Sequence, residues 1–135
     1  MGRFVNPGNG AFQADVNSEI YVDKTGLLRF TNQVINTNAA FICNSRPRRF
    51  GKSVTANMLA AYYSKGSDSK NIFSRLDISK SADYEKHRNQ YDVIHFDVQR
   101  CVEAISGPEK FVSFITESII KELQQIYPGV LDENV

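Results

Sequence analysis

The sequence predicts an α/β fold, in which short buried strands alternate with amphipathic helices. Two apolar runs, 39–43 and 91–98, have the length and residue types of buried strands. Apolar residues at helical spacing lie before and after each run, and no hairpin turn signal joins the two. Because strands connected through helices run parallel, we expect a parallel sheet with flanking helices.

The composition predicts a soluble domain, or part of one. The chain has 135 residues, of which 41% are hydrophobic and 23% charged, and its net charge of +1 gives no overall bias toward nucleic acid or membrane. No apolar run approaches the roughly 20 residues that cross a bilayer, and no signal peptide follows Met1. Cys43 and Cys101 lack metal-type spacing. We therefore expect a cytoplasmic protein whose two reduced cysteines are small core residues.

The remaining elements follow in chain order. Residues 1–19 are rich in Gly and Asn and predict an extended lead-in. Asp23 is placed to cap a first helix over 24–35, which has one apolar face. A second helix is expected over 54–63, and a third, with proline in its first turn, over 108–127.

The stretch 39–64 has the layout of a phosphate-binding unit: strand, loop, Gly51-Lys52-Ser53, helix. Backbone N–H groups at a helix start cannot pair inside the helix, and with the helix dipole they attract anions. Gly51 permits close approach of a phosphate, and Lys52 would reach the outer phosphates. The Ser53 hydroxyl is a hard oxygen ligand suited to Mg²⁺.

The general phosphate-loop pattern, G-x-x-x-x-G-K-[ST], is incomplete here because Arg46 occupies the first glycine position. The triplet alone is common by chance, and the neighbouring strand and helix give it weight. Asp97 closes the second apolar run, and it would lie near Mg²⁺ if the two predicted strands were neighbours. We interpret His95 as a core or half-exposed residue rather than a catalytic one.

Four strings match one protein family in the same order: NPGNGAF at 6–12, SEIYVDKTGLL at 18–28, NSRPRRFGKSV at 44–54 and YDVIHFDV at 91–98. The chain thus resembles the N-terminal part of the predicted AAA-ATPase-like family of bacterial and archaeal P-loop proteins. The phosphate loop of that family is typically R-P-R-R-F-G-K-S, so Arg46 departs from the general pattern but not from the family.

The resemblance implies a P-loop NTPase-like α/β domain that binds ATP and Mg²⁺, with residues 1–135 as its N-terminal part. Family members are longer and carry a Walker B motif ending in Asp-Glu downstream, often followed by a domain that resembles PD-(D/E)XK nucleases. The chain is therefore expected to bind ATP while hydrolysis belongs to a longer protein, with Ser53 as the metal ligand. The implied nucleotide-binding residues are Arg48, Arg49, Phe50, Gly51, Lys52, Ser53 and Val54.

Two alternatives stay open. Arg46, Arg48, Arg49 and Lys52 place four cations within seven residues. These arginines could serve a protein partner or a non-catalytic module that holds nucleic acid or another anion, since guanidinium groups suit phosphate. The chain could also be a scaffold that binds no nucleotide. Phosphate-backbone binding weakens steeply with salt, which separates the nucleic-acid alternative from ATP binding.

Overall fold

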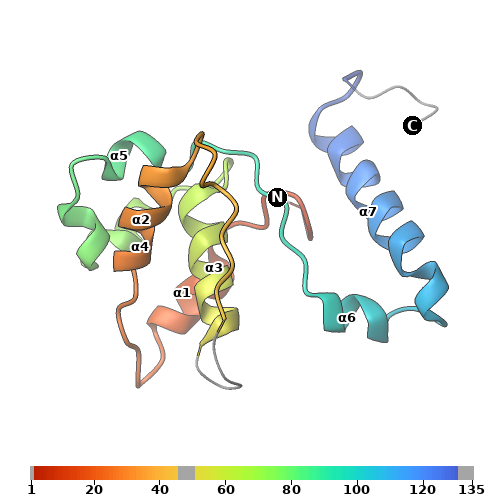
Figure 1. Ribbon diagram of the computed structural model, residues 1–135, viewed down its shortest axis with the longest axis horizontal. Coiled ribbons are helices and arrows are strands. Elements are labelled where there is room, and N and C mark those ends of the chain that lie inside the picture. Colours follow the sequence, from red (N-terminus) through yellow and green to blue (C-terminus); the bar gives the residue numbers. More distant parts are fainter. Residues whose placement is uncertain (1, 46–50, 131–135) are drawn as a thin grey trace.

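The computed structural model describes residues 2–45 and 51–130, and within them the protein is helical (Figure 1). The predicted α/β P-loop fold with a parallel sheet is therefore wrong for the described residues, whose only β pairing consists of isolated bridges. The elements are α1 (Gly10–Val16), α2 (Gly26–Val34), α3 (Lys52–Tyr63), α4 (Lys70–Phe73), the 3-10 helix η1 (Asp77–Lys80), α5 (Tyr84–His87), α6 (Val98–Glu103), the 3-10 helix η2 (Pro108–Lys110) and α7 (Phe111–Ile126).

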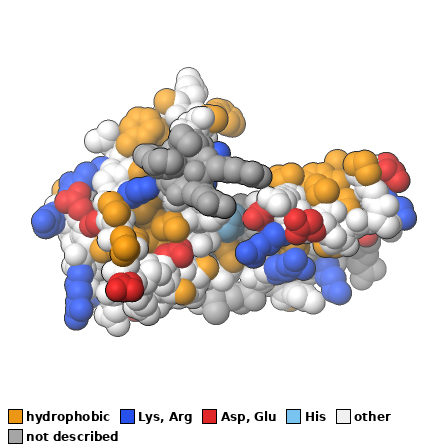
Figure 2. All heavy atoms as spheres, turned by 90° about the horizontal axis from the view of Figure 1, so that it is seen from below, with side chains coloured by type: hydrophobic (Ala, Val, Ile, Leu, Met, Phe, Trp, Pro, Cys, Tyr) orange, Lys and Arg blue, Asp and Glu red, His pale blue; other side chains and the backbone are white. Residues whose placement is uncertain are grey.

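Neither expected strand forms: the run 39–43 is exposed, and the run 91–98 alternates between half-buried and exposed residues and ends at the first residue of α6. The run 39–43 carries Phe41, whose side chain is 97% exposed. The run 91–98 makes only single bridges, of Ile94 with Val5 and of Tyr91 with Ser64. An extended segment becomes a strand only when a neighbour pairs with its backbone groups. The described residues provide that pairing at single positions only, and Phe41, Ile42, Ile94 and Phe96 of the two runs remain exposed. Figure 2 shows hydrophobic side chains on both halves of one face of the molecule.

The three predicted helices are confirmed as α2, α3 and the pair formed by η2 and α7. Pro108 begins η2, where its fixed φ suits the first turn of a helix. The predicted extended lead-in over 1–19 is wrong in part, because α1 forms inside it. Phe12 of α1 is 1% exposed, so tertiary packing explains this short helix better than local propensity does.

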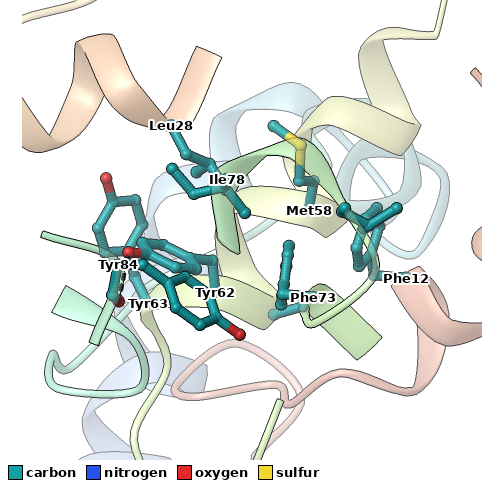
Figure 3. Packing of buried hydrophobic residues seen from close by; sticks show 10 residues of the cluster. Phe12, Leu28, Met58, Tyr62, Tyr63, Phe73, Ile78 and Tyr84 are labelled. Carbon is teal, nitrogen blue, oxygen red and sulfur yellow. Dashed lines mark hydrogen bonds between the residues drawn. The ribbon is translucent and has the colours of Figure 1, made fainter. Parts of the chain in front are cut away.

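The main core lies among α1 to α5 and η1, which we call the body (Figure 3). Phe73 stacks on Phe12 with ring centroids 5.0 Å apart, and Tyr62 meets Phe73 edge-on at 5.4 Å. The buried hydroxyl of Tyr63 donates to Asn32 Oδ1 at 2.6 Å. Burial raises the pKa of Tyr62 to about 12 and raises that of Tyr63 as well, so both phenols stay neutral at physiological pH.

The helices α6, η2 and α7, which we call the arm, lie to one side of the body (Figure 1). Residues 2–6, the strap, connect the two parts. The strap pairs with the body-side segment at 93–95, where Asn6 N donates to Val93 O at 2.8 Å. On its other side, the Glu122 carboxylate of α7 accepts hydrogen bonds from three consecutive strap N–H groups, at 2.7 to 2.8 Å.

Candidate functional site

The start of α3 is shaped by Gly51, which caps the helix in the left-handed conformation with φ +82° and ψ +26°. Glycine adopts this conformation without the steric cost that a Cβ brings. Thr55 fixes the first turn, since its N and Oγ1 both donate to Gly51 O at 2.9 Å. No side chain among the described residues caps this end. The first N–H groups of α3 are therefore oriented as an anion site requires.

A cavity of about 430 Å³ lies between this end of α3 and the strap and arm. Lys52 and Ser53 line it on the body side, and both are exposed. Arg3 of the strap and Arg100 of α6 line the opposite side. Three cationic side chains thus surround a space of the size that small-molecule sites commonly have.

Asp97 is the only carboxylate among the described residues that line this cavity. It caps α6, and its Oδ1 accepts a hydrogen bond from Arg100 N at 3.3 Å. The Arg100 guanidinium lies 3.9 Å from the other carboxylate oxygen. The structure places Asp97 on the same cavity as Lys52 and Ser53. It lies at the start of a helix, and not at the end of a strand beside a neighbouring strand as the prediction required.

The structure places only some of the other predicted residues. Arg46, Arg48, Arg49 and Phe50 lie outside the described residues, and Val54 is half-buried in the first turn of α3. His95 is half-buried, lines the cavity, and donates through its backbone N to Phe4 O at 2.8 Å. Cys101 is buried as predicted, whereas the core prediction for Cys43 is wrong because that residue is exposed.

Arg3, Arg100 and Asn57 also line the cavity, and no motif in the sequence selects them. Arg3 belongs to a segment predicted to be an extended lead-in, and Arg100 to a short helix that replaces the end of a predicted strand. Asn57 stands one turn after Ser53, and its side chain donates to Asp15 Oδ2 at 3.0 Å, which joins α3 to α1. A helical wheel of α3 could have indicated Asn57, because a residue four positions after Ser53 lies on the same face of the helix.

The described part of the chain contains no cluster of three or more His, Cys, Asp or Glu side chains suited to a metal. A metal bound in the cavity would therefore have few protein ligands. Ser53 and Asp97, which both line the cavity, could each supply an oxygen ligand. Within the same residues, no helix combines the length and apolarity needed to cross a membrane.

These features describe a helical protein with a cation-lined cavity at the glycine-capped start of a helix. The family model described as predicted AAA-ATPase matches residues 13–131. The chain therefore belongs to the AAA-ATPase-like family. No significant match was found among curated proteins or among solved structures.

Proposed function

We propose that the protein binds ATP together with Mg²⁺ at the start of α3. The observation that carries this proposal is that Lys52 and Ser53, which directly follow the glycine cap of α3, line a cavity of about 430 Å³ with Asp97. Membership of a family of predicted AAA-ATPases supports it.

Each residue has a distinct task in the proposed site. The N–H groups at the start of α3 donate hydrogen bonds to phosphate oxygens, and the Lys52 ammonium adds a mobile positive charge. Ser53 and Asp97 offer the oxygen ligands that Mg²⁺ prefers, and both belong to the same cavity. Bound Mg²⁺ would neutralise charge on the phosphate oxygens.

The test of this proposal is a calorimetric titration with ATP and Mg²⁺. Lys52→Ala should weaken binding at least tenfold, because a hydrogen bond to a charged group contributes about 1.5–3 kcal/mol. Lys65→Ala is the matched control, since Lys65 is half-exposed, pairs with Asp92 at 3.2 Å and lies away from the cavity. Equal affinities of wild type and Lys52→Ala would contradict the proposal.

We further propose that the 135-residue chain binds ATP without turning it over. One carboxylate lines the described cavity, and it does not easily serve both as a metal ligand and as the group that orients an attacking water. A phosphate-release assay should give the background rate. Turnover that disappears in Asp97→Asn would show that this carboxylate is sufficient for hydrolysis.

The arginine-rich sequence 46–49 supports a second candidate, the binding of nucleic acid. If Arg48 and Arg49 contact a phosphate backbone, replacing both by alanine should reduce the salt slope of binding by about two. We expect no nucleic-acid binding at physiological salt, since the chain as a whole carries a net charge of only +1. A gel-shift titration at two salt concentrations decides between these outcomes.

A further inference from the structure

Lys24 approaches the start of α3 from the residues that precede α2. A Cβ built on Gly51 would lie 3.0 Å from Lys24 Nζ, so the ammonium group packs against the residue that caps α3. Lys24 is half-buried and lines a second cavity, of about 480 Å³, whose lining also includes Asn44, Thr55 and the two carboxylates Asp23 and Asp77. Thr55 is also the residue that holds Gly51 O. The ammonium group therefore lies beside the start of α3 and belongs to a different cavity from Lys52.

The backbone on each side of Lys24 is held in place by Asp23. One Asp23 carboxylate oxygen accepts from Thr25 N at 2.9 Å and Thr25 Oγ1 at 2.6 Å, and the other accepts from Asp77 N at 2.8 Å. Thr25 is fully buried, and its hydroxyl accepts a hydrogen bond from Ile78 N at 3.1 Å. The segment is thus fixed to η1 at several points.

The ionisation of Asp23 is consistent with this arrangement. Desolvation acts to raise the pKa of the Asp23 carboxyl, but the hydrogen bonds from Thr25 and Asp77 outweigh it, and the pKa is lowered. The carboxylate therefore stays ionised at physiological pH and keeps its three donors. Because the backbone at Lys24 is held in place, the Lys24 side chain loses less conformational freedom on binding an anion than a lysine on a mobile loop would.

We infer that Lys24 is a second phosphate-binding residue of the nucleotide site, and this inference rests on the proposed function. A phosphate chain bound at the start of α3 would meet Lys52, which lines the first cavity, and the Lys24 ammonium, which lies against Gly51. The carboxylates of the Lys24 cavity already have partners, since Asp23 accepts from Thr25 and Asp77 pairs with Arg29. Two ammonium groups and a helix N-terminus then favour the ligand with the most negative charge. Lys24 thereby directs the site toward a nucleoside triphosphate over a monophosphate.

The experiment compares wild type, Lys24→Met, Lys24→Arg and the control Lys65→Met by calorimetric titration with ATP and Mg²⁺, and then with AMP. Thermal melting without ligand verifies that each variant is folded. We expect Lys24→Met to weaken ATP about tenfold or more and AMP less than threefold, because the removed ammonium acts on the outer phosphates. Lys24→Arg, which retains the charge, should restore most of the ATP affinity. Lys24→Gln replaces Lys24→Met if the methionine variant does not fold.

The outcomes separate the inference from the proposed function. Unchanged ATP affinity in a folded Lys24→Met, with affinity lost in Lys52→Ala, overturns the inference alone and leaves Lys24 as a packing residue. Equal losses for ATP and AMP also overturn it, since Lys24 would then not distinguish the number of phosphates. Absence of ATP binding by the wild type overturns both.

Discussion

The body and the arm are held in their positions by different forces. The body buries ten residues in one hydrophobic cluster, including five aromatic side chains that contact one another. The cluster that joins the strap to the arm has three buried members, Phe4, Cys101 and Ile115. In the 16-residue helix α7 only Ile115 is buried. Beside this small cluster, polar contacts attach the arm, through Glu122 and through the hydrogen bond from Tyr127 to Asp92.

This difference bears directly on the candidate site, because its cavity has one wall on each part. Lys52 and Ser53 come from a helix fixed in the body core, whereas Arg3 and Arg100 come from the strap and the arm. The body wall should therefore remain in place when the arm loosens, and the opposite wall should not. The following predictions test this division, beginning with the largest effect.

The largest effect is expected in the body core. Phe73 is fully buried between Phe12 and Tyr62, so Phe73→Ala should lower the free energy of unfolding by about 3–5 kcal/mol. Urea denaturation measures this change. Phe41→Ala is the control, because its ring is 97% exposed and its removal should change stability by no more than about 0.5 kcal/mol. If Phe111→Ala in the arm costs as much as Phe73→Ala, the body and arm share one core and the division fails.

A smaller and more local effect is expected at Glu122. Glu122→Ala removes the acceptor of three strap N–H groups. A buried donor without a partner costs about 1–3 kcal/mol, and water that hydrogen-bonds to the donor reduces this cost. Hydrogen exchange should accelerate in α7 and in strap residues 2–6 while α3 is unchanged. Glu117→Ala, an exposed substitution on the same helix, is the control. Acceleration across α3 as well would contradict the division.

The smallest effect is a dependence on acid. The hydrogen bond from Tyr127, followed by that from Asn6, lowers the pKa of Asp92 below its ordinary value of 3.8. A carboxyl with a lowered folded-state pKa contributes stability that is complete above the unfolded value and is lost as the pH falls through the folded one. Below about pH 4, Asp92→Asn should therefore lose less stability than the wild type does. Identical pH profiles from urea midpoints would show that Asp92 does not stabilise the attachment.

The helices could be predicted because their signals are local. The apolar face over 24–35, the helix after Gly51 and the proline-led helix over 108–127 all formed close to their expected bounds. The strands could not, because β structure depends on a neighbour that the sequence does not specify. Both runs are apolar, but among the described residues 91–98 forms only isolated bridges, at Tyr91 and Ile94, and 39–43 forms none. The strand prediction from residue propensity was therefore wrong for both runs.

The candidate site was predicted where residues are adjacent in the sequence and missed where the fold assembles them. Lys52 and Ser53 follow a recognisable glycine, and Gly51 has the positive φ that only glycine adopts easily. Lys24 lies against Gly51 through a contact that spans 27 positions (51 minus 24), and no spacing rule covers such a contact. Arg3 and Arg100 reach the cavity only because the strap and α6 lie beside α3.

Hydrogen exchange measured with and without ATP and Mg²⁺ tests most directly whether a nucleotide occupies the cavity between the body and the arm. The expected result is slower amide exchange at the start of α3, over 51–57, together with slower exchange in strap residues 2–6 and at 93–101. Exchange in α4 and α5, on the far part of the body core, should not change. Unaltered exchange over 51–57 in the presence of saturating ATP would contradict the proposed site.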